Sequence, residues 1–154
     1  MLHVLCRIGQ DAYAIPCEAV EKVLPFASLK SLPGSVRGLA GVLNYQGNPL
    51  PVVDLSLLLA GQPSREVMGT RILLCPVSAM PSGRLGLLVE EVSEVTNLAE
   101  EDFRFAGATS DECLDGVVSV SAQLIQRIEI PGILPPEVAA GLRMNPAFTA
   151  ASAP

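Results

Sequence analysis

Carboxylates are the residues of this sequence best suited to carry out chemistry. Glu90-Glu91 and the run Glu100-Glu101-Asp102 bring acidic groups together, and Asp54 directly follows an apolar segment. Such groups can act as general acids and bases, or they can bind a hard cation. Neighbouring residues on a strand point to opposite faces, so Glu90 and Glu91 are predicted to be separated. The later run lies in a polar segment, where a solvated surface is the usual explanation.

Asp54 has two interpretations. In a hydrolase, it would act together with Glu90. As a helix cap, its carboxylate, or alternatively the hydroxyl of Ser56, would accept hydrogen bonds from the first backbone N–H groups of a short helix through 57–59, and Gly61 would end that helix. We favour the cap, because the sequence contains no second aspartate motif that would complete a catalytic dyad.

Nucleophilic catalysis and cofactor binding have little support in the sequence. His3 is the single histidine, and its apolar neighbours make it an exposed or partly satisfied strand residue rather than a catalytic base. The sequence has no glycine-rich phosphate-binding motif. The cysteines are far apart and include no CxxC pair; they are Cys6, Cys17, Cys75 and Cys113. We therefore expect no catalytic residue, no metal site, no disulfide framework and no cofactor.

Composition indicates a globular protein with much apolar surface to cover. Of the 154 residues, 49% are hydrophobic and only 17% are charged, against about 25% charged residues in an average domain. The net charge of -6 disfavours nucleic-acid binding, which needs a dense basic face. No basic segment precedes a long apolar one at the N-terminus, and no apolar stretch approaches the ~20 residues that span a bilayer. We expect a cytoplasmic protein that does not insert into the membrane.

Short apolar runs separated by turn residues predict β-hairpins along most of the chain. The runs pair as 2–8 with 12–16, 36–43 with 49–55, 71–77 with 84–89, and 114–120 with 124–130. A further strand is predicted at 92–98, where broken alternation indicates a bulge. Helical turns are predicted at 18–23, 57–59, 131–134 and 137–142.

The predicted fold class is therefore all-β, with two small barrels packed together. One domain is expected to cover residues 1–143, with two lobes that divide near 62–69. A flexible tail at 144–154 is expected to follow, because its composition specifies no packed element.

Four segments of the sequence resemble the CheW-like family. The central segment runs from Gly41 to Leu55 and reads Gly-Val-Leu-Asn-Tyr-Gln-Gly-Asn-Pro-Leu-Pro-Val-Val-Asp-Leu. It is similar to the family's Gly-Val-Ile-Asn-Leu-Arg-Gly, a short variable stretch and Pro-Val-Ile-Asp-Leu. The segments at 5–23, at 86–92 and from the last hairpin to 131–134 follow in the same order. The resemblance covers about residues 2–134.

The resemblance implies two intertwined five-stranded SH3-like barrels with a hydrophobic groove between them, and no catalysis. It also implies an adaptor that bridges the cytoplasmic tips of chemoreceptors and the regulatory domain of a CheA-type histidine kinase. By position, the residues that match kinase-facing places of the family are Cys17, Val20, Lys22 and Val23. The residues that match its central turn are Asn44, Gln46 and Gly47.

Plainer explanations exist for several of these residues. Val20 and Val23 fit a core as well as an interface, and Gly47 fits a turn that needs a positive φ. Gln46 departs from the family's usual arginine, whose charged fork glutamine cannot replace. This departure indicates a divergent coupler, serving surface sensing, biofilm formation or a pilus rather than flagellar taxis. An alternative function remains open, in which a small β-barrel protein binds a hydrophobic ligand between its lobes.

Overall fold

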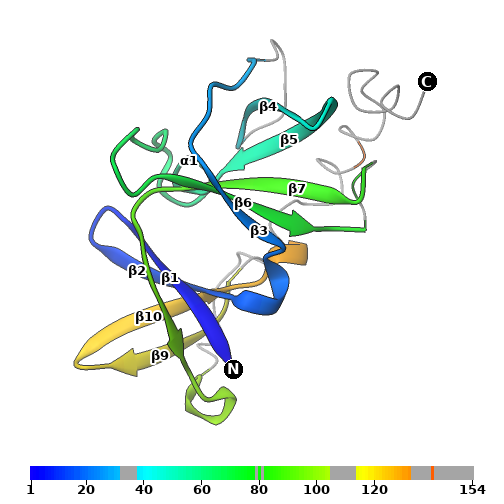
Figure 1. Ribbon diagram of the computed structural model, residues 1–154. Coiled ribbons are helices and arrows are strands. Elements are labelled where there is room, and N and C mark those ends of the chain that lie inside the picture. The colour runs from blue at the N-terminus through cyan, green and yellow to red at the C-terminus, as the bar shows by residue number, and fades with distance from the viewer. Residues whose placement is uncertain (32–37, 79, 81, 105–113, 133–139, 141–154) are drawn as a thin grey trace.

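The computed structural model describes residues 1–31, 38–78, 80, 82–104, 114–132 and 140, and these residues form two five-stranded sheets (Figure 1). The strands are β1 (Leu2–Ile8), β2 (Asp11–Pro16), β3 (Lys22–Pro25), β4 (Leu39–Tyr45), β5 (Asn48–Asp54), β6 (Arg71–Pro76), β7 (Arg84–Val89), β8 (Val92–Asn97), β9 (Leu114–Val120) and β10 (Gln123–Ile128). The short helices are η1 (Cys17–Ala19), α1 (Leu55–Ala60), η2 (Glu100–Asp102) and η3 (Ile130–Gly132). The predicted all-β fold class is confirmed.

The two sheets share one strand arrangement. The first sheet has the order β8-β1-β2-β10-β9, and the second sheet has the order β3-β6-β7-β5-β4. In each, a central antiparallel hairpin pairs in parallel with a second hairpin, and a further strand forms the edge beside the central hairpin. None of the pairings between described residues joins the two edges of a sheet into a closed barrel.

The chain crosses between the sheets at two points, before β3 and before β8. β3 follows β2 but belongs to the second sheet, whereas β8 follows β7 but belongs to the first. In Figure 1, β8 is the unlabelled green strand that runs from the upper, second sheet down to the lower, first sheet. The second sheet is therefore built from one continuous stretch of chain, β3 to β7, and the first sheet from the strands before and after it. The segment 62–69 connects α1 to β6 within that stretch and does not separate the sheets.

The hairpin predictions agree with the structure. The four expected hairpins correspond to β1-β2, β4-β5, β6-β7 and β9-β10. The irregularity predicted in β8 is also present, because the register between β1 and β8 shifts between Leu5 and Cys6 and leaves Ser93 without a direct partner in β1. Residues 36 and 37, most of the turn expected at 137–142 and the tail at 144–154 lie outside the described residues.

The helical turn predicted at 18–23 is wrong in its second half. The 3-10 helix η1 ends after a single turn, and Lys22 already belongs to the strand β3. The backbone N–H of Glu21 donates to the carbonyl oxygen of Leu74 at 2.7 Å, which starts the pairing of this segment with β6. Pairing with a distant strand thus overrides the local apolar spacing, as tertiary contacts commonly do.

The helix α1 has the predicted cap and the predicted terminating glycine, although it spans Leu55–Ala60 rather than 57–59 alone. The Asp54 carboxylate accepts a hydrogen bond from the backbone N–H of Leu57 at 3.2 Å, which confirms the cap. Gly61 has a φ of 74°, and its N–H donates to the carbonyl oxygen of Leu57. Glycine adopts this left-handed conformation without the steric cost of a Cβ atom.

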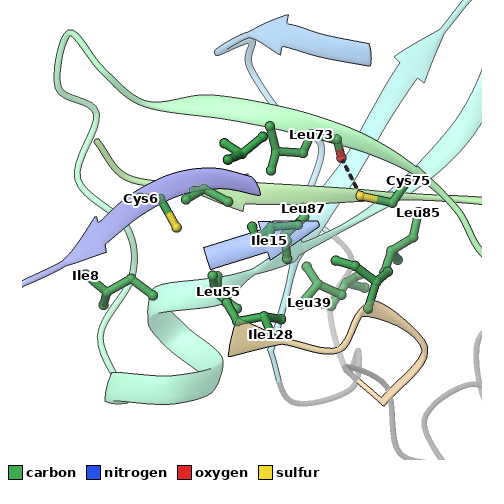
Figure 2. Packing of buried hydrophobic residues seen from close by; sticks show 14 of the residues in the cluster. Cys6, Ile8, Ile15, Leu39, Leu55, Leu73, Cys75, Leu85, Leu87 and Ile128 are labelled. Carbon is green, nitrogen blue, oxygen red and sulfur yellow. Dashed lines mark hydrogen bonds between the residues drawn. The ribbon is translucent and has the colours of Figure 1, made fainter. Parts of the chain in front are cut away.

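A principal core of buried apolar side chains fills the space between the sheets (Figure 2). Both sheets contribute to it, with Cys6 and Ile15 from the first and Leu73 and Leu87 from the second. Its buried members are Val4, Cys6, Ile8, Ile15, Leu39, Val53, Leu55, Leu73, Cys75, Met80, Leu85, Leu87, Val89, Ile128 and Ile130. A smaller second-sheet cluster, built on Val52, Ile72 and Leu88, lies on the other face of the second sheet. The sheets therefore share one main core.

His3 is more deeply buried than the sequence suggested. Its ring has no exposed surface and lies beside Phe103, with the ring centroids 5.5 Å apart. Nδ1 lies 3.0 Å from the carbonyl oxygen of Met1, to which the neutral ring donates, while Nε2 has no partner among the described residues. Burial lowers the pKa of His3 below its usual value of 6.5.

We expect the free energy of unfolding to decrease as the pH falls below 6.5. In that range the unfolded chain takes up a proton that the folded chain binds less readily, so protonation favours unfolding. For one proton, the slope of the free energy of unfolding against pH has a limit of about 1.4 kcal/mol per pH unit. Urea unfolding between pH 7.5 and 5.5 measures it, and His3→Phe should flatten the curve because the chain has no other histidine. Equal slopes in both proteins would contradict the prediction.

Candidate functional site

The two buried carboxylates that were considered for catalysis hold the segment between α1 and β6. Asp54 accepts hydrogen bonds from the backbone N–H of Ser64 at 2.8 Å and from its hydroxyl at 2.6 Å, in addition to capping α1. Glu90 accepts hydrogen bonds from the backbone N–H of Arg65 at 3.1 Å and from its Nε at 2.5 Å. Because these contacts engage both carboxylates, the arrangement is structural rather than hydrolytic.

Asp54→Ala is expected to lower the free energy of unfolding by about 2 kcal/mol. The change removes a helix cap and leaves the Ser64 N–H and hydroxyl without their acceptor in a partly buried place. Asp54→Asn should cost less, because its amide oxygen can still accept one of these bonds. Denaturant unfolding of both variants measures the difference. Equal losses for alanine and asparagine would contradict this account of the hydrogen bonds.

Glu91 and Glu100 each lie beside an arginine side chain. Glu90 is buried and the Glu91 side chain is 44% exposed, but the predicted separation of these neighbours is wrong, because both carboxylates lie beside the Arg65 guanidinium, at 2.5 and 3.7 Å. The two residues lie between β7 and β8 rather than on a strand, so the alternation of strand side chains does not apply to them. Glu100 differs from the solvated residue that was expected, because it accepts two hydrogen bonds from the buried Arg127 at 2.5 and 3.0 Å. These bonds lower the pKa of Glu100. The Arg127 guanidinium also lies 4.1 Å from the centre of the Phe103 ring.

The structure divides the first group of candidate partner-binding residues between core and surface. Cys17 and Val20 are half-buried and pack against the principal core. Val23 is 47% exposed, and Lys22 beside it is exposed. In the pairing of β3 with β6, Val23 lies opposite the core residue Leu73 and therefore points to the same side of the sheet. Val23 thus extends the principal core to an edge that is open to solvent.

The strand β3 is itself an edge strand. Among the described residues it forms a ladder with β6 alone, and its other side makes no ladder with any of them. Such an edge can bind a partner through its backbone, its side chains or both. An exposed valine on this edge adds apolar surface that a partner could bury.

The second group of candidates forms the turn between β4 and β5. Gln46 and Gly47 have φ values of 52° and 84°, which are typical of the two central residues of a type I′ hairpin turn. The Gly47 N–H donates to Oδ1 of Asn44 at 3.0 Å, and all three side-chain positions are exposed. The positive φ predicted for Gly47 is confirmed. Gln46 stands at the tip, where its amide is accessible to a partner.

Both groups lie at the same end of the second sheet. β3 begins there with Lys22, and β7 begins there with Arg84, which pairs with the last residue of β6. β5 runs parallel to β7, so its first residue and the β4–β5 turn lie at this end too. The groups belong to opposite edges, separated by roughly 19 Å if the strands are ~4.8 Å apart in a flat sheet.

Val95 is an exposed apolar residue that was not among the candidates predicted from the sequence. Val95 lies on β8, the edge strand of the first sheet, and is 57% exposed. It pairs with Val4 of the principal core, just as Val23 pairs with Leu73. Leu2, also exposed, is its diagonal neighbour on β1. The available signal was one apolar residue between Glu94 and Thr96, but only the shared arrangement of the sheets reveals the correspondence.

Other kinds of site find no support in the described part of the chain. There, no group of three or more His, Cys, Asp or Glu side chains is arranged to hold a metal ion. Buried side chains of the principal core occupy the region between the sheets, which is where a hydrophobic ligand was considered (Figure 2). No helix among the described residues has the length and apolar character needed to cross a bilayer.

Comparisons with known proteins agree with the fold and with the motifs. The family model for the CheW-like domain matches residues 2–137. The crystal structure of the scaffolding protein TtCheW from Thermoanaerobacter tengcongensis superposes with a TM-score of 0.79, at 18% sequence identity and over 89% of each chain. At this identity, the structural likeness establishes the fold.

Two curated proteins are similar in sequence over most of their length. The chemotaxis protein CheW of Rhizobium meliloti is 25% identical over 138 residues, which are 85% of each chain. The probable chemotaxis protein CheW of Rhizobium etli is 23% identical over 131 residues, covering 82% of this chain and 83% of the relative.

Proposed function

Because this chain belongs to the CheW-like domain family, we propose that it couples chemoreceptors to a CheA-type histidine kinase in a bacterial chemosensory pathway. Proteins of this family are non-catalytic scaffolds or adaptors. The chemotaxis proteins from the two Rhizobium species, similar to it over most of their length, support a role in chemosensory signalling. An adaptor of this kind acts in the cytoplasm by holding its partners together, which raises their local concentration.

The proposed kinase-binding surface is the edge formed by η1 and β3. One observation carries this assignment: Val23 is 47% exposed on an edge strand, while Val20 and Cys17 beside it anchor the segment to the principal core. A firmly held apolar residue at an open edge can be buried by a partner at little cost in ordering. Lys22 adds a charge that can select the partner.

The turn residues Asn44, Gln46 and Gly47 are proposed to extend this surface, because they lie at the same end of the second sheet. Gln46 is exposed at the tip and supplies an amide where an arginine would supply a charged fork. A partner that needs such a fork would bind weakly. We therefore assign the protein to a divergent pathway, such as surface sensing, biofilm formation or a pilus system.

An adaptor needs a second surface for its other partner. The β8 edge of the first sheet offers one, because Val95 and Leu2 are exposed there in an arrangement that repeats the β3 edge. We assign the cytoplasmic tip of the chemoreceptor to this edge. Two separate edges allow both partners to bind at once.

Calorimetric titration with the regulatory domain of a CheA-type kinase from the same genome tests the proposal. We expect saturable binding that persists when a receptor-tip fragment is already bound. Competition between the two partners would contradict the assignment of separate edges. Absence of binding to the kinase domain and to the receptor tip would overturn the adaptor function itself.

A further inference from the structure

The segment 98–104, which we call the strap, lies across the face of the first sheet that points away from the principal core. Its apolar residues Leu98 and Phe103 are buried in a separate cluster with side chains from β2, β9 and β10. Beyond η2, the backbone groups of Arg104 and Val117 exchange two hydrogen bonds, at 2.7 and 2.9 Å. The strap therefore shields an apolar surface of the first sheet, which we call its outer face, from solvent.

A buried histidine lies on the outer face, beneath the strap. Side chains alternate along β1, so His3 shares the face of Leu5, which packs against the cluster under the strap, rather than the face of Val4 in the principal core. The His3 ring has no exposed surface, and its centroid lies 5.5 Å from that of the Phe103 ring. Nδ1 is 3.0 Å from the carbonyl oxygen of Met1, whereas Nε2 has no hydrogen-bond partner among the described residues. Under the closed strap, a proton on Nε2 would find no acceptor among them.

The Phe103 ring of the strap also contacts a cation. Arg127 on β10 is buried, and its guanidinium carbon lies 4.1 Å from the centre of that ring. The same guanidinium donates to both carboxylate oxygens of Glu100 in η2, at 2.5 and 3.0 Å, so it holds the strap at two places. One aromatic ring is therefore shared by a guanidinium and an imidazole, and a proton on the imidazole would add a second positive charge beside it.

The groups that face His3 disfavour its protonation. Burial lowers its pKa most, and the charges of Arg127 and of the Met1 amino group lower it further. The hydrogen bond to Met1 and the Glu100 carboxylate act in the opposite direction, but the net shift is downward. Glu94 of β8 shares this face but is exposed, so solvent screens its charge. Displacement of the strap would hydrate the ring, and the opened form would then bind a proton more readily than the closed form.

We propose that His3 is an acid-sensitive latch for the strap: protonation of its imidazole at Nε2 releases 98–104 from the outer face and uncovers the apolar side chains beneath. When the strap leaves, water can accept a hydrogen bond from the new N–H, which offsets the lost contacts of Phe103 and Glu100 only in the protonated protein. The principal core lies on the opposite face of β1, so the release is local and leaves that core in place. This latch does not depend on which partners the protein binds.

Opening of the strap is expected to depend on pH. The closed form holds the pKa of His3 below 6.5, whereas a hydrated imidazole has the ordinary value, so a falling pH stabilises the opened form. For one proton, the opening equilibrium constant rises about tenfold between pH 7.5 and 5.5 when the closed form binds that proton negligibly. Glu100 remains ionised in this range, because its hydrogen bonds with Arg127 lower its pKa. The pH dependence of opening therefore reports on His3.

Native-state hydrogen exchange on the full chain tests the latch. The reporters are the backbone amides of Phe103, Arg104 and Val117, and each exchange rate is divided by the intrinsic rate of that amide at the same pH. Lys30 and Val42 supply the matched control, because they form the corresponding isolated pair of hydrogen bonds on the second sheet, at 2.9 and 2.8 Å. Urea-independent exchange reports local opening rather than global unfolding. For the strap amides it should rise about tenfold between pH 7.5 and 5.5, and for the control pair it should stay constant.

Two variants remove the titrating group in different ways. His3→Phe keeps a ring beside Phe103, and His3→Gln keeps an N–H that can donate to the carbonyl oxygen of Met1. In either variant, protection of the strap amides should stay constant between pH 7.5 and 5.5. A loss of protection that persists in a folded variant would overturn the proposal. So would a wild-type strap whose protection does not change with pH, or whose exchange follows global unfolding at every urea concentration. An equal, urea-independent loss at Lys30 and Val42 would also overturn it, because the effect would then not be local to the strap.

Discussion

Val23→Asp is expected to weaken binding of the kinase regulatory domain at least tenfold. Val23 is 47% exposed at the β3 edge, so a partner that covers this edge would bury the new carboxylate. A buried charge without a partner costs several kcal/mol, whereas a tenfold change in affinity needs only about 1.4 kcal/mol. The free energy of unfolding should fall by about 1 kcal/mol or less, because the side chain already faces solvent. Calorimetric titration and urea unfolding measure the two effects.

Val95→Asp provides the matched control for this experiment. Val95 has a similar exposure and occupies the corresponding place on β8 in the first sheet. The substitution Val95→Asp should leave the affinity for the kinase domain unchanged and weaken binding of the receptor tip. If both substitutions reduced kinase binding equally, the effect would come from net charge or from general destabilisation. The assignment of the kinase to the β3 edge would then be wrong.

Leu87→Ala is expected to lower the free energy of unfolding by about 3 kcal/mol, within the range for large-to-small substitutions at fully buried positions. Leu87 is fully buried in the principal core, to which both sheets contribute. Its loss should therefore destabilise both sheets in one cooperative transition, as expected for a single domain over residues 1–143. Leu124→Ala, at an exposed position on β10, should change the stability by less than about 0.5 kcal/mol.

The two tyrosines make cooperativity measurable. Tyr13 lies on β2 in the first sheet and Tyr45 on β4 in the second, and the chain has no tryptophan. The variant Tyr45→Phe therefore keeps Tyr13 as its one fluorescent probe, in the first sheet, and Tyr13→Phe keeps Tyr45 as its one probe, in the second sheet. Coincident urea transitions at both probes, shifted together by Leu87→Ala, would support one domain. Separate transitions would show that the lobes unfold independently.

Local structure was largely predictable from the sequence. Alternating apolar residues and turn residues identified the hairpins, and the cap and end of α1 followed from Asp54 and Gly61. The positive φ of Gly47 was predicted in the same way. These features depend on contacts within a few residues of the chain, which is the range over which sequence patterns act. The central motif also indicated the family.

Only the tertiary structure decided which strands became edges and which candidates became surface. The crossing of the chain from β2 in the first sheet to β3 in the second turned an expected helical turn into an edge strand and exposed Val23 while Val20 packed against the core. It also brought Glu21 to Arg84, 63 positions away in the chain. Such contacts depend on which apolar faces are buried together, and that is settled by the whole chain because burial of apolar surface is the dominant driving force of folding.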